Sequence, residues 1–246
     1  MKLPIFIAIL AHPFALTLVA EEKWHQKYIS LESPTSDRFI KEGLAYAESL
    51  YGKAKIPVTK VNLRLSQPIR DENIRKNFQL TETTDPAKGI FTIYLSRRPN
   101  EYSYHGQLAH EIGHLLNSRL MDAYMEGLCT LFSEKYLKRN NMDWSGWEKW
   151  YKDDSNGDRF YASTYFMMRE INATLGDEAM RNFLDFAEET PNRRGSMHIN
   201  IEKWLASLPA SQKSQAKEII LEHAPVIKRH LQAFRHDILF QLPKDN

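Results

Sequence analysis

The segment YHGQLAHEIGHLLNSRLMDAYME, residues 104–126, decides how this chain folds around a candidate site. Apolar residues recur at helical spacing over residues 104–119 and again over residues 124–139, which predicts two successive helices. His110 and His114 lie four positions apart, so both imidazoles are on one face of the first helix. Two imidazoles in this arrangement can reach a single metal ion.

A catalytic zinc site needs three protein ligands and one open position, so a third donor must fold back onto the histidine pair. Glu126 is the favoured candidate, because the eleven residues between it and His114 are enough to close an antiparallel helix hairpin around the ion. Asp122 is nearer in sequence and is the competing ligand, although it falls in the expected turn. The metzincin pattern is excluded, since Asn117 and Leu120 stand where that pattern has Gly and His. The sequence therefore predicts one Zn²⁺ per chain.

The arrangement HEIGH followed by a helix that opens with Glu-Gly resembles the gluzincin metallopeptidases, in particular the peptidase MA-like family. The resemblance covers roughly residues 36–184. It implies that His110, His114 and Glu126 bind zinc, and that Glu111 is the general base of a zinc-dependent peptidase acting through a metal-activated water. The alternative is a non-catalytic zincin-fold binding module in the cell envelope.

The same resemblance implies a catalytic tyrosine and a substrate-binding strand. Tyr161 precedes Gly176 by fifteen residues, as the oxyanion-stabilising tyrosine of aminopeptidase-type gluzincins precedes a helix-ending glycine. Tyr165 and His198 are the alternative donors. The strand expected over residues 90–95 would correspond to the sheet edge along which an extended peptide or protein substrate pairs.

The rest of the pattern predicts an α+β, zincin-like fold, with a small N-terminal sheet, the HExxH helix and a mainly helical C-terminal part. A polar connection is expected over residues 70–88. Period-two alternation predicts a strand over residues 58–65, and a second strand is expected over residues 90–95. Helical spacing predicts helices over residues 36–51, 104–119, 124–139, 144–151, 159–175, 178–188, 199–205 and 211–240, the last broken near Pro225.

The N-terminal residues 1–20 have the character of a cleavable signal peptide, with a plausible cleavage site after Ala20. We expect a secreted or periplasmic protein without stable membrane insertion after leader removal; the alternatives are a retained membrane anchor and an anchored intracellular peptidase. Residues 21–190 would form the gluzincin-like domain, and residues 191–246 a helical C-terminal extension packed on the same unit.

The charge composition narrows the classes of partner that the chain can bind. The 33 Lys and Arg residues nearly balance the 31 Asp and Glu residues, so the net charge of +2 argues against a nucleic-acid ligand.

The single cysteine, Cys129, can form no internal disulfide and is expected to pack inside its helix. Trp144, Trp147 and Trp150 recur every three residues; packing is the favoured role, and a wall of a substrate groove is the alternative. No oligomeric state is predicted.

Overall fold

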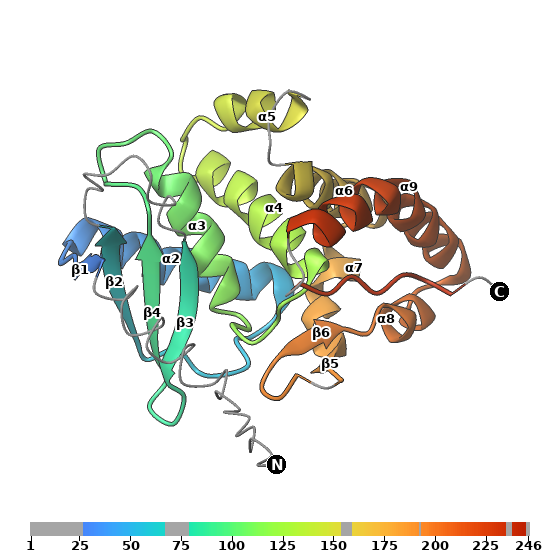
Figure 1. The fold of residues 1–246 in the computed structure, drawn as a ribbon, viewed down its shortest axis with the longest axis horizontal. Coiled ribbons are helices and arrows are strands. Elements are labelled where there is room, and N and C mark those ends of the chain that lie inside the picture. The colour runs from blue at the N-terminus through green and yellow to red at the C-terminus, as the bar shows by residue number, and fades with distance from the viewer. Residues whose placement is uncertain (1–26, 67–78, 154–158, 192, 235–237, 245–246) are drawn as a thin grey trace, which may run out of the picture.

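The computed structural model describes residues 27–66, 79–153, 159–191, 193–234 and 238–244. In this part the chain is a mixed α+β protein, with an N-terminal sheet followed by a mostly helical region (Figure 1). The α+β prediction is thus confirmed. The predicted leader, residues 1–20, lies outside the described residues.

The main sheet has four strands in the order β1-β2-β4-β3. The central pair, β2 and β4, is parallel, and each outer strand runs antiparallel to its neighbour. The strands are β1 (Tyr28–Ser30), β2 (Lys60–Ser66), β3 (Leu80–Asp85) and β4 (Ile90–Leu95).

Strand β3 was not predicted from the sequence, because the polar run LTETTD reads as part of the connection over residues 70–88. It forms because a turn through Gly89, whose φ is +64°, returns the chain as a hairpin against β4. The expected edge role of residues 90–95 is therefore wrong: β4 is paired on both sides. Within the described residues, β1 and β3 are the two edge strands of this sheet, and β3 is the edge that contacts α3 through Thr81 and Glu111.

The helices follow the predicted pattern with three differences. They are α2 (Pro34–Tyr51), α3 (Tyr104–His114), α4 (Ala123–Arg139), α5 (Ser145–Lys152), α6 (Arg159–Leu175), α7 (Asp177–Arg181), α8 (Ile201–Ser207) and α9 (Ala210–Phe234).

First, α3 ends at His114 rather than at residue 119, because Leu115 and Leu116 close the helix with tight bonds to Ile112 and Gly113. Second, the segment predicted as a helix over residues 178–188 becomes α7, a 3₁₀ turn and a short strand, β5 (Ala187–Glu189). That strand pairs with an unpredicted one, β6 (Met197–Ile199), so tertiary pairing overrides local helix propensity here.

Third, α9 continues through Pro225 without the predicted break. Proline removes one backbone hydrogen bond, but burial of Ile220, Ala224 and Ile227 on the face that packs against α6 offsets this loss.

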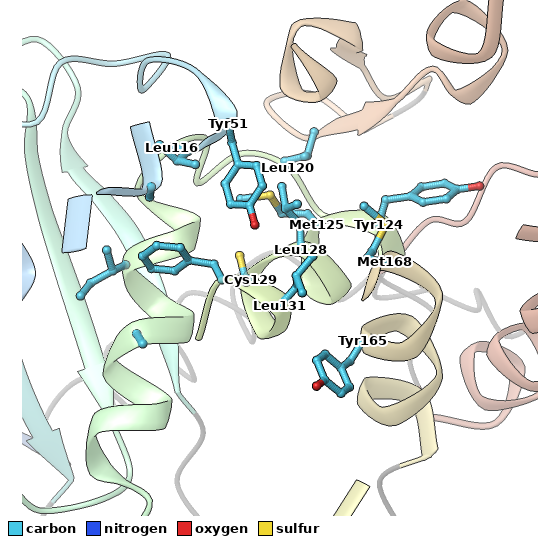
Figure 2. Close-up of a cluster of buried hydrophobic side chains, with 14 of the residues drawn as sticks. Tyr51, Leu116, Leu120, Tyr124, Met125, Leu128, Cys129, Leu131, Tyr165 and Met168 are labelled. Atoms are coloured by element: carbon cyan, nitrogen blue, oxygen red, sulfur yellow. The ribbon is translucent and has the colours of Figure 1, made fainter. Parts of the chain in front are cut away.

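Helix α4 lies at the centre of the core, between α3 on one side and α6 on the other. Figure 2 shows Met125, Leu128, Cys129 and Leu131 of α4 within this cluster, with Tyr165 of α6 nearby. Two glycines permit the close approach. A side chain at Gly113 would meet the Cys129 sulfur at 2.8 Å, and one at Gly127 would meet the Thr164 carbonyl of α6 at 2.3 Å.

Residues after position 191 contribute to the same core through Ile199, Trp204, Ile220 and Ile227. Among the described helices, none is long and apolar enough to span a bilayer.

Candidate metal centre

His110, His114 and Glu126 converge to form a site that can hold a metal ion. The His110 and His114 Nε2 atoms are 3.2 Å apart, and Glu126 Oε2 lies 3.2 Å from His110 Nε2 and 3.6 Å from His114 Nε2. Ligands about 2.0–2.1 Å from a tetrahedral zinc ion are separated by about 3.3 Å. The three donor atoms therefore already stand at the spacing of three corners of such a tetrahedron.

The antiparallel contact between α3 and α4 produces this convergence. His114, at the end of α3, faces Glu126 near the start of α4. His110 lies one turn earlier on α3 and faces Thr130, which lies one turn later on α4. Gly113 lets the α4 backbone come close enough, since its missing side chain would overlap Cys129. Cys129 is thus a buried packing residue at the helix crossing, as expected, and burial raises the pKa of its thiol.

The turn that delivers Glu126 to the histidines is held by the C-terminal part of the chain. Met121 bonds through its backbone to Met197 of β6, and its carbonyl accepts from the Leu239 N–H. The Ala123 N–H in turn donates to the Leu239 carbonyl. Segments more than seventy residues downstream therefore set the start of α4, and with it the position of the third ligand.

Asp122, the competing ligand candidate, has a different role. One carboxylate oxygen accepts from the Tyr124 N–H at 2.7 Å and caps α4, and the other accepts from the Ile199 N–H at 3.0 Å. Both oxygens are engaged by backbone donors, so Asp122 anchors β6 to the helix start and does not belong to the ligand cluster.

Thr130 orients the first histidine, a role that the sequence prediction missed. Its hydroxyl donates to the Glu126 carbonyl at 2.9 Å and lies 3.2 Å from His110 Nδ1. Because the hydroxyl proton is used on the carbonyl, its oxygen accepts from His110 Nδ1–H, so Nε2 is the ring nitrogen that faces the ligand cluster. The signal available in the sequence was a hydroxyl four residues after Glu126, on the same helix face.

Glu111, the predicted general base, is buried beneath the cluster against β3. The Thr81 hydroxyl lies 2.8 Å from both its Oε2 and its backbone carbonyl. Burial raises the pKa of the Glu111 carboxyl, while His114, His110 and the Thr81 bond act in the opposite direction. A raised carboxylate pKa brings this group closer to the range in which a base is effective at neutral pH.

The pKa of the Glu126 carboxyl is shifted in the opposite direction. Burial alone would raise the pKa of its carboxyl, but the charges and hydrogen bonds of His114 and His110 hold it well below its usual range. The surroundings thus shift the pKa values of these two carboxyl groups, which lie on adjacent helices, in opposite directions.

The structure separates the three candidate oxyanion donors. The Tyr161 ring meets the His110 ring edge to face at 5.8 Å between centroids. Tyr165 is fully buried, and its hydroxyl donates to Glu134 at 2.9 Å and accepts from Trp144 at 3.1 Å. His198 is on β6, 3.8 Å from Glu188. Of the three, Tyr161 is the one beside the cluster.

A cavity of about 460 Å³ opens beside His110. Tyr161, Thr130, Trp147 and Trp150 are among the residues that line it. Trp144 also lines the cavity, and its Nε1 donates to the Tyr165 hydroxyl. The tryptophans therefore have the packing role that was favoured, and they also form part of the cavity wall.

Comparison with protein-family models, with curated proteins and with solved structures finds no match to this chain. The site is therefore described by its own geometry: two histidines and one carboxylate on a helix hairpin, which together could hold a metal ion.

Proposed function

We propose that this chain is a zinc-dependent peptidase of gluzincin type with a zincin-like fold. The observation that carries the proposal is the spacing of the His110, His114 and Glu126 donor atoms, 3.2–3.6 Å from one another. Two imidazoles and one carboxylate are the ligand set of catalytic zinc sites that leave a fourth position open. The antiparallel edge strand β3 beside the motif helix supports the same assignment.

When bound, zinc would polarise the scissile carbonyl and lower the pKa of a water molecule, so that the water can lose a proton and attack the carbonyl carbon near neutral pH. Glu111 takes the proton from the attacking water and passes it to the leaving amine. Thr81 holds Glu111 Oε2, so the carboxylate keeps one orientation while the proton moves. Tyr161, beside His110, donates a hydrogen bond to the oxygen on which negative charge develops.

The substrate is a peptide or protein segment in extended form. On its outer side, strand β3 pairs with no other strand of the described residues, and an extended peptide can add to such an edge through main-chain hydrogen bonds. The cavity leaves room for a substrate next to His110, one of the three proposed ligands, which supports turnover over the alternative of a closed binding module.

Zinc content and hydrolysis together test the proposal. We expect one zinc per chain in the purified protein, loss of that zinc in His114→Ala, and retained zinc with abolished peptide hydrolysis in Glu111→Gln. Stoichiometric zinc in His114→Ala would refute the ligand assignment. Undiminished cleavage by Glu111→Gln would refute the assignment of the base. Zinc binding without cleavage of any peptide in a mixed library would favour the non-catalytic cell-envelope module.

Export to a secreted or periplasmic location is part of the proposal and rests on the leader predicted over residues 1–20. Sequencing of the mature N-terminus tests it: a chain that begins at Glu21 would support cleavage after Ala20, and an intact leader would favour the membrane-anchored alternative.

A further inference from the structure

The cavity beside His110 is walled largely by aromatic rings. Six of its lining residues are aromatic, and they come from the chain before α3, from α5 with the residue preceding it, and from α6: Tyr102, Trp144, Trp147, Trp150, Tyr151 and Tyr161. His110 and Tyr161 place one end of the cavity at the proposed metal centre. Tyr102 and Trp150 are 64% and 40% exposed, so the walls reach the surface.

The rings form an ordered stack. Trp147 stacks on Trp144 at 6.0 Å and on Tyr151 at 6.0 Å, and meets Trp150 edge to face at 6.1 Å. The Trp147 indole lies against Gly106, one turn before His110, where a side chain would approach three ring atoms at 2.7–2.9 Å. Its buried Nε1 has no hydrogen-bond partner among the described residues, so stacking holds the ring in place.

The charges that line the cavity favour a neutral occupant over a cationic one. In the described part of the chain, no acidic residue lines it, and Arg97 does. Arg97 is paired with Glu101 at 3.2 Å, which leaves the mouth close to neutral. A cation would meet aromatic faces without an acidic partner and with a guanidinium nearby, whereas a neutral apolar group would gain burial against several rings.

Helix α5, which carries three of the rings, is fastened to the site helices. Arg169 of α6 donates to Glu148 at 2.9 Å, and Trp144 bonds to Tyr165, which bonds in turn to Glu134 of α4. These contacts preorganise the walls before any ligand arrives, so little ordering is required on binding.

We propose that this cavity is the specificity subsite of the enzyme and holds a bulky apolar or aromatic side chain of the peptide, next to the bond that is cleaved. The proposal rests on the peptidase function proposed above and adds the class of residue that the enzyme selects. Trp147 and Trp150 form the walls that contact this side chain, and Gly106 sets the position of Trp147.

The test uses two blocked alanine-rich octapeptides that differ only in one central residue, Phe or Ala. Cleavage is followed by mass spectrometry, and binding by tryptophan fluorescence of the Glu111→Gln protein. We expect cleavage at a bond adjacent to Phe and a clear preference for the Phe peptide.

Two variants probe the wall from different sides. Trp150→Ala removes an exposed ring, and Gly106→Ala displaces Trp147 without removing it. Each should reduce the Phe-to-Ala ratio of kcat/KM by about tenfold, with unchanged zinc content. Leu221→Ala, at an exposed position on α9, is the control and should leave the ratio unchanged.

A Phe preference that persists unchanged in both variants would overturn the subsite. If neither peptide is cleaved, the proposed peptidase function is refuted. The fluorescence assay then still tests whether the cavity binds the Phe side chain. A fluorescence change with the Phe peptide that disappears in a Trp150→Ala version would support it. No fluorescence change with either peptide would overturn the subsite. A change seen only with a chitin trisaccharide, used as a non-peptide probe of the aromatic walls, would also overturn it.

Discussion

Replacing Thr130 by valine tests whether the structure around the metal ligands is organised as described. Valine keeps the shape of threonine and removes only the hydroxyl that bridges the Glu126 carbonyl and His110 Nδ1 at 2.9 and 3.2 Å. Without it, the buried His110 Nδ1–H loses its acceptor, and the imidazole is no longer held in the orientation and tautomer that present Nε2 to the ion.

The expected loss is in metal affinity rather than in folding. Removing an outer partner of a metal-binding histidine typically weakens metal affinity by about 10–100-fold, equivalent to about 1.4–2.8 kcal/mol. Thr130→Val should therefore raise the zinc dissociation constant by this factor. The free energy of unfolding of the zinc-free protein should change by about 1 kcal/mol or less, the usual net value of one hydrogen bond.

The chain offers a closely matched control. Thr164 is also fully buried, lies in the adjacent core helix, and its hydroxyl also donates to the carbonyl four residues earlier, that of Phe160. It has no hydrogen bond to the ligand cluster. Thr164→Val should change the stability of the zinc-free protein as Thr130→Val does, but leave the zinc affinity unchanged.

The measurement is a zinc titration against a chromophoric chelator at fixed pH, combined with urea unfolding of the zinc-free proteins. Equal zinc affinities for the two variants would refute the orienting role of Thr130. A large loss of stability in Thr130→Val alone would show that the hydroxyl acts on the fold instead.

Three further predictions concern proton equilibria, helix packing and the oxyanion donor. Lys152 and Arg169 hold the pKa of Glu148 at about 2, so its stabilising effect is present above the ordinary pKa near 4.5 and is lost as pH falls through 2. The difference in unfolding free energy between wild type and Glu148→Gln should shrink between pH 5 and 2 by about 1 kcal/mol or less, because the pair is partly exposed. Gly127→Ala should destabilise the protein by about 1–3 kcal/mol in thermal unfolding, because the new methyl group overlaps the α6 backbone; a neutral effect would mean that the two helices are not in close contact. Tyr161→Phe should lower kcat by about 10²-fold or more with zinc retained, whereas Tyr165→Phe should mainly lower stability; the reverse pattern would exchange their roles.

Local periodicity was enough to predict most helices and the convergence of His110, His114 and Glu126. Two histidines at positions i and i+4 share a helix face in any tertiary context, and the length of the turn before Glu126 limited where the second helix could lie. The order of the predicted elements also gave the α+β class, because β2 carries apolar residues at period two and β4 is a short apolar run, and both precede the helical region.

What the sequence missed depends on partners that are distant along the chain. β3 is polar, and it is a strand because β4 supplies its hydrogen bonds; β5 and β6 likewise exist through each other. After α3 closes at His114, the carbonyls of Leu116 and Arg119 accept from the distant Lys55 and Met197 N–H groups, which keeps this segment out of the helix. The continuity of α9 through Pro225 likewise accompanies burial of its apolar residues against the core.

The sequence by itself determined which residues can bind a metal, because helix geometry converts their spacing directly into a shared face. Only the tertiary structure showed that Glu126, and not Asp122, lies with the two histidines, and that the Tyr161 ring contacts His110. In each pair both side chains have the right chemistry, and the position of each depends on contacts that are distant along the chain. Asp122 is held by two backbone N–H groups and Tyr165 by Glu134 and Trp144, and these bonds join segments that no local pattern relates.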